Sequence, residues 1–293
     1  MTRIRSILAA ADFSPNSRYA AERAAILGAT LGVEKGLLLH VLEESWLESM
    51  KPFVSSPTDE IQRGIIDDAS NSLLGLAEEV RQSSGFSFET RVLTGRTLNV
   101  IVEAALDHDL LVVGAHGRHP VLALALGTTA QRLLGKTRRS VLVVKSKPDR
   151  PYRRVLTAVD FSPNSRKAME YGSIIAPGAL VTVVHVYEPL LERQMISVGA
   201  SEKVLEEYRA KARSHAETQM KVFLEAAERG TGGLLQRIEY GHASARLPEI
   251  AQEWGPDLVI VGKHGRSRVE ELLLGSVTIH LLSQSQCDVL VVQ

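Results

Sequence analysis

The chain has 293 residues, with 34 Lys and Arg residues balanced by 34 Asp and Glu residues, and only 5% aromatic residues. This length predicts about two domains, each large enough to bury its own core. Zero net charge and few aromatic residues argue against a nucleic-acid binder, which needs a basic surface or stacking platforms. The single cysteine, Cys287, excludes an intrachain disulfide framework and multi-cysteine metal sites. It also predicts a reducing, cytoplasmic location.

No apolar run approaches the roughly 20 residues of a membrane-spanning helix, so we expect no integral membrane contact. Residues 1–11 combine basic and apolar residues as a signal peptide does, but Asp12 ends the apolar stretch too early. The same pattern recurs in the middle of the chain, where no signal peptide could act. Residues 6–11 are therefore predicted to form a buried strand.

The chain contains a tandem duplication. Three segments repeat with an offset of 148 residues: 7–18 as 155–166, 110–118 as 258–266, and 141–144 as 289–292. A period of this length is too long for a solenoid repeat, so each copy is a whole domain. The predicted domains are 1–146 and 153–293, joined by a short, charged, proline-containing linker.

Each copy begins with an apolar run, predicted to be a buried strand, at residues 6–11 and 155–159. The sequence Asp-Phe-Ser-Pro follows in both copies, and its Ser-Pro predicts a helix start with serine as the N-cap. A second strand is expected at residues 36–41 and 180–186.

A polar insertion then leads to a long amphipathic helix, at about residues 60–83 and 201–229. A third strand, at residues 86–93 and 234–240, runs toward a glycine. A helix, a glycine-rich strand–loop, another helix and a last strand complete each copy. Strands that alternate with helices predict a parallel sheet with helices on both faces.

The glycine-rich loop after the fourth strand has the spacing Gly-x2-Gly-x9-Gly-Ser/Thr in both copies. Its glycines are Gly114, Gly117 and Gly127 in copy one, and Gly262, Gly265 and Gly275 in copy two. Thr128 and Ser276 follow, where the next helix begins. Backbone N–H groups, a hydroxyl and the positive end of a helix dipole predict a phosphate site there. The alternative is that these glycines only form tight turns.

The order of these motifs resembles the universal stress protein family over nearly the whole chain, as two successive family domains. The resemblance implies that each domain is a doubly wound five-stranded parallel sheet of order 3-2-1-4-5. It also implies an ATP site, with a divalent metal such as Mg²⁺ bridging the phosphates.

The resemblance assigns a role to each candidate residue of that site. Asp12 and Asp160 would contact the ribose, and Val41, Val186, Val113 and Val261 would line the adenine pocket. The phosphate end would comprise Gly114, Gly117, Arg118, Gly127, Thr128 and Thr129 in copy one, and Gly262, Gly265, Arg266, Gly275, Ser276 and Val277 in copy two.

Simpler roles remain for several of these polar residues. Asp12 and Asp160 could instead cap the Ser-Pro turn that follows them. His40 and His185, which recur at the end of the second strand, are predicted to be hydrogen-bonded core residues rather than metal ligands. The sequence assigns no metal ligand and no catalytic residue.

Three functions remain compatible with these residues. The leading hypothesis is a stress-response regulatory protein that binds an adenine nucleotide in one or both copies. A slow ATP hydrolase and an interaction scaffold with vestigial sites are the alternatives. The resemblance also implies that the two copies pair through their last strands as an intramolecular pseudo-dimer, which would cover two apolar edge strands. A further homodimer and the identity of a regulatory partner are left undecided by the sequence.

The two sites are expected to differ in affinity. Copy two has Arg266 and Arg268 after its second glycine, whereas copy one has Arg118 followed by His119 and Pro120. Two guanidinium groups can neutralise phosphate oxygens better than one. Copy two is therefore predicted to bind ATP more tightly.

Overall fold

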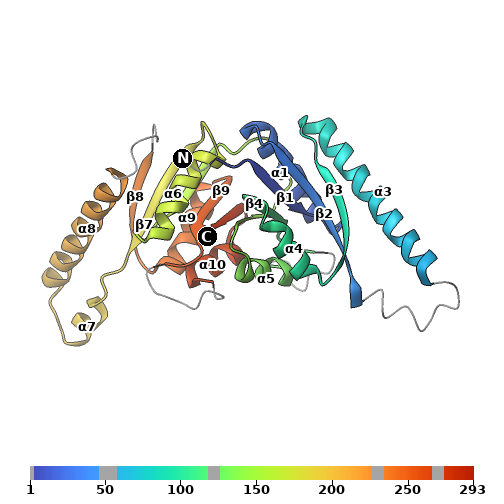
Figure 1. Cartoon of the computed structure of the whole chain (residues 1–293). Helices are drawn as coiled ribbons and strands as arrows, with labels where there is room; N and C mark the ends of the chain where they lie inside the picture. The colour runs from blue at the N-terminus through green and yellow to red at the C-terminus, as the bar shows by residue number, and fades with distance from the viewer. Residues whose placement is uncertain (1–2, 46–57, 118–125, 226–233, 266–273) are drawn as a thin grey trace.

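The structure, a computed structural model, describes residues 3–45, 58–117, 126–225, 234–265 and 274–293. Two α/β domains lie side by side and share one ten-stranded sheet (Figure 1). Within the described ranges, no helix is both long and apolar enough to cross a membrane.

Strands and helices alternate in both domains. The first domain contains β1 (Ser6–Ala10), α1 (Pro15–Leu31), β2 (Lys35–Glu43), α3 (Thr58–Ser84), β3 (Glu89–Gly95), α4 (Thr97–Ala105), β4 (Leu110–Gly114), α5 (Thr128–Lys136) and β5 (Ser140–Val144). The second contains β6 (Arg154–Ala158), α6 (Pro163–Ile175), β7 (Leu180–Tyr187), α7 (Glu192–Ser197), α8 (Glu202–Glu225), β8 (Leu235–Tyr240), α9 (Ala243–Trp254), β9 (Leu258–Gly262), α10 (Ser276–Gln284) and β10 (Asp288–Val292).

The strand order confirms the predicted fold. The sheet runs β3-β2-β1-β4-β5 in the first domain and β8-β7-β6-β9-β10 in the second, with parallel pairs within each domain. Successive strand residues face opposite cores, as Leu111 packs with α4 and α5 while Val112 packs with α1 and α3. The strand order reverses between β1 and β4, and between β6 and β9, which places a ligand crevice at each of these points.

The Ser-Pro segments start helices α1 and α6 as predicted. Ser14 is the N-cap of α1, and its hydroxyl accepts a hydrogen bond from the backbone N–H of Ser17 at 3.2 Å. Ser162 does the same for Ser165 at 3.2 Å. The preceding residue, Phe13, has a φ of +62°, a left-handed conformation that is uncommon for a side chain of this size. This conformation turns the chain from the end of β1 into α1.

Two parts of the fold differ from the sequence prediction. Strand β3 begins at Glu89 rather than at residue 86, because the Phe86 ring packs where Gly28 and Gly36 carry no side chain. An ideal Cβ on Gly36 would lie 2.5 Å from that ring. The polar insertion of the second domain contains the additional helix α7, which the sequence reading did not anticipate.

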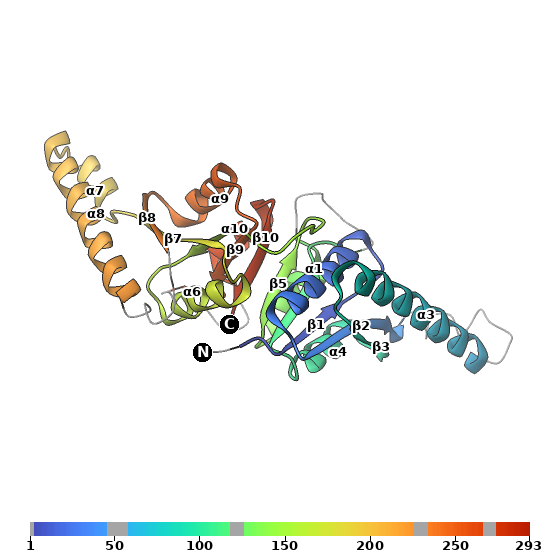
Figure 2. The same cartoon turned by 90° about the horizontal axis from the view of Figure 1, so that it is seen from above.

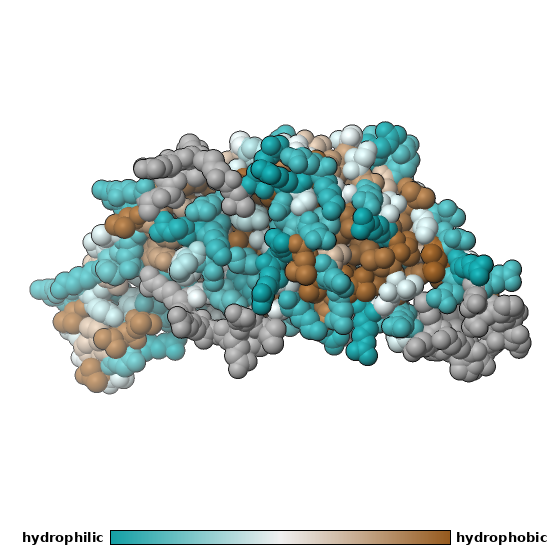
Figure 3. Space-filling view, in the orientation of Figure 1, coloured by the Kyte–Doolittle hydropathy of each residue, from teal (hydrophilic) through white to brown (hydrophobic). Residues whose placement is uncertain are grey.

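The long helices α3 and α8 lie at opposite ends of the molecule (Figures 1 and 2). Hydrophobic side chains gather over the α7 region at the lower left of Figure 3. The exposed apolar residues of this region are Leu190, Leu191, Ile196 and Val198.

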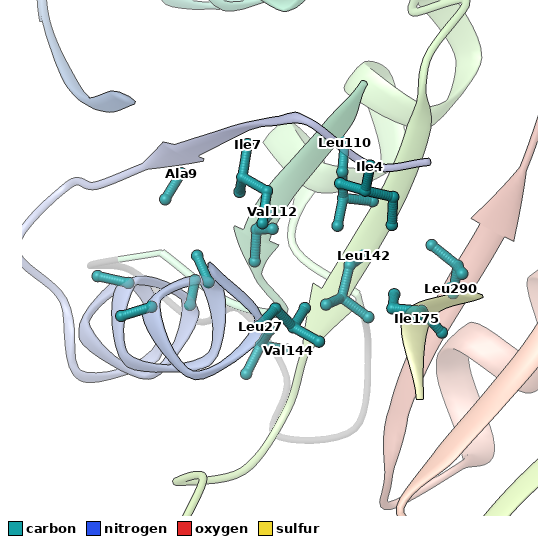
Figure 4. Close-up of a cluster of buried hydrophobic side chains, with 14 of the residues drawn as sticks. Ile4, Ile7, Ala9, Leu27, Leu110, Val112, Leu142, Val144, Ile175 and Leu290 are labelled. Atoms are coloured by element: carbon teal, nitrogen blue, oxygen red, sulfur yellow. The ribbon is translucent and has the colours of Figure 1, made fainter. Parts of the chain in front are cut away.

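The two domains meet along the antiparallel pair β5–β10. Leu142 lies opposite Leu290, and these residues occupy equivalent positions of the duplication. Leu142, Ile175 and Leu290 belong to one buried cluster, so the hydrophobic core continues from one domain into the other (Figure 4). The seam between the domains thus has the pseudo-twofold arrangement of a symmetric pair.

Candidate functional site

A cavity of about 510 Å³ lies beyond the carboxyl ends of β1 and β4. It is lined by all eight predicted residues of the first domain that the structure describes: Asp12, Val41, Val113, Gly114, Gly117, Gly127, Thr128 and Thr129. These eight residues come from four separate parts of the sequence and converge on one cavity, at the point where the strand order reverses.

The second domain has a smaller cavity, of about 250 Å³, at the equivalent place. It is lined by Asp160, Val186, Val261, Gly262, Gly265, Gly275, Ser276 and Val277. Arg118 and Arg266 lie outside the described residues, and so does Arg268, on which the expected order of affinities also depends. Among the described residues, the larger cavity of the first domain favours that domain, rather than the second, as the tighter binding site.

The aspartates combine a local role with a place on the cavity wall. Asp12 Oδ1 accepts a hydrogen bond from the backbone N–H of Ser14 at 3.0 Å, and Asp160 Oδ1 accepts one from Ser162 at 3.1 Å. The turn-capping alternative is therefore realised. It does not compete with a ligand role, because each carboxyl group also lines its cavity.

The second glycine of each motif makes room for that carboxylate. An ideal Cβ on Gly117 would lie 2.9 Å from Asp12 Oδ2, and one on Gly265 would lie 2.6 Å from Asp160 Oδ2. The first glycine has a different neighbour, since a Cβ on Gly114 would lie 2.7 Å from the backbone carbonyl of Asn16. The motif thus packs the loop against the start of α1.

The third glycine closes the loop with its own amide. Gly127 N–H donates to the carbonyl of Ala115 at 2.8 Å, and Gly275 N–H donates to the carbonyl of Lys263 at 3.0 Å. These two amides are therefore engaged within the loop. The donors left for an anion are the first-turn amides of α5 and α10, whose N-cap glycines supply no side-chain cap and whose first turns contain no acidic residue.

The histidines near the ends of β2 and β7 are hydrogen-bonded, as predicted, but only His40 is buried, whereas His185 is half-buried. His40 Nδ1 lies 2.7 Å from the carbonyl oxygen of Ala11, and His185 Nδ1 lies 2.8 Å from that of Val159. Because a carbonyl only accepts, Nδ1 carries the proton in each ring. Each imidazole also packs on a phenylalanine of the Asp-Phe-Ser-Pro turn, with ring centroids 4.4 Å apart for Phe13 and His40.

Glu43 and Thr97 line the first cavity and were missed by the sequence reading. Glu43 accepts a hydrogen bond from the backbone N–H of Thr97 at 2.9 Å, at the start of α4. Hydrogen bonds from the Thr97 hydroxyl and amide lower the pKa of Glu43. The sequence spacing could have identified Glu43 as a cavity residue. It follows Val41 by two residues and therefore lies on the same face of the strand.

Glu43→Ala is expected to destabilise the protein by about 0.5–2 kcal/mol at neutral pH, the usual cost of losing a helix cap. Since the folded-state pKa is lowered, this stabilisation is present above the unfolded value and disappears as pH falls through the folded one. Urea unfolding at pH 7 and below pH 4 measures the effect, with the exposed neighbour Glu44→Ala as the matched control. An equal loss of stability at both pH values would contradict the capping role.

Each domain thus combines a doubly wound sheet with a cavity at its switch point, and a carboxylate and an uncapped helix N-terminus both line that cavity. These features define a tandem α/β protein with a candidate ligand site in each domain. The sequence model of the universal stress protein family matches residues 3–145 and 151–293. The chain therefore belongs to the universal stress protein family.

Individual relatives agree with this assignment. Universal stress protein Slr1230 of Synechocystis is 26% identical over 223 residues, covering 74% of this chain and 70% of that protein. The putative universal stress protein SH1215 of Staphylococcus haemolyticus is 30% identical over 146 residues, covering 48% of this chain and 85% of that protein. A crystal structure of a universal stress protein from Archaeoglobus fulgidus matches with a TM-score of 0.72 at 19% identity, covering 100% of this chain and 99% of that one. At this identity, the structural match shows the fold alone.

Proposed function

We propose that this protein is a cytoplasmic stress-response regulator that binds an adenine nucleotide, ATP, in one or both cavities. The observation that carries the proposal is the placement of a carboxylate and an uncapped helix N-terminus on the walls of one apolar cavity. A nucleotide has three parts with matching chemistry: a flat base, a ribose diol and an anionic phosphate chain.

Each part of the nucleotide has a partner in the first domain. Val41 and Val113 provide an apolar wall for the base, and the carboxylate of Asp12 can accept hydrogen bonds from the ribose hydroxyls. The first-turn amides of α5 and the hydroxyls of Thr128 and Thr129 are suited to the phosphates. In the second domain, Asp160 and Ser276 take the corresponding places.

Magnesium would enter the site with the phosphates. No group of three His, Cys, Asp or Glu side chains among the described residues is arranged to hold a metal ion. Mg²⁺ commonly binds through substrate phosphates and one or two protein oxygens. The hydroxyls of Thr128 and Ser276 fit such a supporting role, which would neutralise phosphate charge.

Asp12→Asn and Asp160→Asn test the two sites separately. The amide Oδ1 can still accept the local hydrogen bond from Ser14 or Ser162, whereas the second acceptor oxygen and the charge are lost. Each variant is expected to weaken ATP binding in its own domain by about ten- to a hundredfold, the cost of one charge-assisted hydrogen bond. Calorimetric titration of the full chain with Mg-ATP measures both phases.

The same titration ranks the two sites. The two arginines after Gly265 predict that the second domain binds more tightly, so Asp160→Asn should remove the tighter phase. Loss of that phase in Asp12→Asn alone would reverse the order and favour the larger cavity. If neither variant changes the titration, the ribose assignment is wrong.

A further inference from the structure

A buried polar network crosses the seam between the two domains. Asp288, at the start of β10, is 1% exposed, and Arg23 of α1 is 6% exposed. Arg23 Nε donates to Asp288 Oδ2 at 3.2 Å, and the hydroxyl of Tyr152 donates to the same oxygen at 2.7 Å. The backbone N–H of Lys145 donates to Asp288 Oδ1 at 2.9 Å. One carboxylate of the second domain is thus held by the first domain and the linker.

The arginine has further partners that fix its position. Arg23 Nη1 donates to the carbonyl of Arg150 at 2.8 Å, and its guanidinium lies 4.0 Å from the centroid of the Tyr152 ring. The guanidinium therefore stays buried with hydrogen bonds to both a carboxylate and a carbonyl. Removal of either charge would leave the other buried without its counter-ion.

The duplication places uncharged residues on the other side of the pseudo-twofold axis. At the offset of 148 residues, Tyr171 corresponds to Arg23, and Ser140 corresponds to Asp288. Tyr171 and Ser140 line one cavity on that side of the axis. The seam therefore contains one ionic pair and one neutral pair at equivalent positions.

We propose that the complementary charges of Arg23 and Asp288 select pairing between the first and the second domain. They disfavour pairing of two first domains or of two second domains. The backbone alone does not make this choice, because Leu142 and Leu290 are equivalent positions that already face each other. Two first domains could pair in the same register, and so could two second domains.

Like pairs would bury unbalanced charge. Two first domains would place Arg23 opposite Ser140 twice, burying two guanidinium groups without a carboxylate. Two second domains would place Asp288 opposite Tyr171 twice, burying two carboxylates without a guanidinium. Only the mixed pair neutralises both charges, so a partner for this surface must present the complementary charge at the start of its last strand.

Cutting the linker of the folded full chain tests this inference. A protease site inserted between the exposed residues Ser146 and Lys147 separates the two halves. Arg150 and Tyr152, which belong to the network, then stay attached to the second half. Native mass spectrometry then distinguishes mixed pairs from like pairs by mass after incubation that permits exchange. The cut protein with its natural seam is expected to contain mixed pairs almost entirely.

The double variant Arg23→Tyr/Asp288→Ser gives both sides of the seam the same neutral pair. After cutting, it is expected to approach a statistical mixture of about 1:2:1 for the three pairings. The matched control, Tyr171→Phe/Ser140→Ala, removes the neutral pair instead and is expected to keep mixed pairs only. If Arg23→Tyr/Asp288→Ser does not fold, Arg23→Gln/Asp288→Asn takes its place, because it removes both charges and keeps a polar side chain at each position.

Three results would overturn the inference. Like pairs in the cut natural protein would show that the charges do not select the partner. Mixed pairs alone in the neutral variant would assign the selection to apolar shape. If that variant gave separate, unpaired halves, the network would be needed for association itself rather than for the choice of partner.

Discussion

Gly275→Val is expected to abolish nucleotide binding in the second domain while the first domain binds as before. The valine methyl groups would stand at the N-terminus of α10, whose first-turn amides bind phosphate in the proposed site. Loss of two charge-assisted hydrogen bonds costs about 3–6 kcal/mol, which weakens affinity by about a hundredfold or more. Calorimetric titration with Mg-ATP measures this loss as the disappearance of one phase.

The backbone of this variant should remain intact. Gly275 has φ −61° and ψ 148°, a conformation that valine adopts without strain. An ideal Cβ there lies 3.3 Å from the carbonyl oxygen of Lys263, a tight contact that a small shift relieves. Gly64→Val is the matched control, because nothing lies within 4 Å of a Cβ at that helical position. Unchanged ATP affinity in Gly275→Val would contradict the phosphate assignment.

Arg23→Tyr is expected to cost about 3–5 kcal/mol of unfolding free energy at neutral pH, because it leaves the buried carboxylate of Asp288 without its counter-ion. Adding Asp288→Ser should recover most of this loss, since the second substitution removes the unpaired charge. Urea unfolding of both single variants and the double variant measures the coupling between the two residues.

The loss in Arg23→Tyr should depend on pH. Burial raises the pKa of Asp288, and Arg23 is the main influence that opposes this rise. Without Arg23 the pKa should rise further, and a raised folded-state pKa stabilises the protein at low pH but not at high pH. The other groups that face Asp288, namely Tyr152, the amide and ammonium groups of Lys145, and the Cys287 thiol, are unchanged in the variant. The deficit should therefore shrink as pH falls from 7.5 to 5, and a constant deficit would contradict this account.

The alternation of strands and helices and the loops that line the cavities could be predicted from the duplicated motifs, whereas the strand order was implied by the resemblance to the universal stress protein family. Asp-Phe-Ser-Pro marks the end of a strand and the start of a helix through local chemistry alone, and Ser14 caps α1 as expected. The three-glycine loop was predicted for the same reason, because its glycines mark close backbone approach. The structure places the close contacts of Gly114 and Gly117 at Asn16 and Asp12.

Contacts between distant segments were beyond such reasoning. The hydrogen bond from Gly127 N–H to the carbonyl of Ala115 depends on how the loop folds back, and it leaves the first-turn amides of α5 as the proposed phosphate donors. The pair Arg23–Asp288 joins residues 265 positions apart, and nothing near either one marks it. Strand β3 begins late for a similar reason, since the Phe86 ring is taken up by Gly28 and Gly36 from elsewhere in the fold.

The double variant Gly127→Val/Gly275→Val tests the proposal of nucleotide binding most directly. Gly127 has φ −59° and ψ 144°, which valine adopts without strain, and an ideal Cβ there lies 3.0 Å from the carbonyl oxygen of Ala115, so the loop must shift slightly to accept it. Titration of the full chain with Mg-ATP is expected to give saturable binding in the natural protein and in Gly64→Val, and none in the double variant. Binding in the double variant equal to that of the natural protein, or none in the natural protein, would contradict the account.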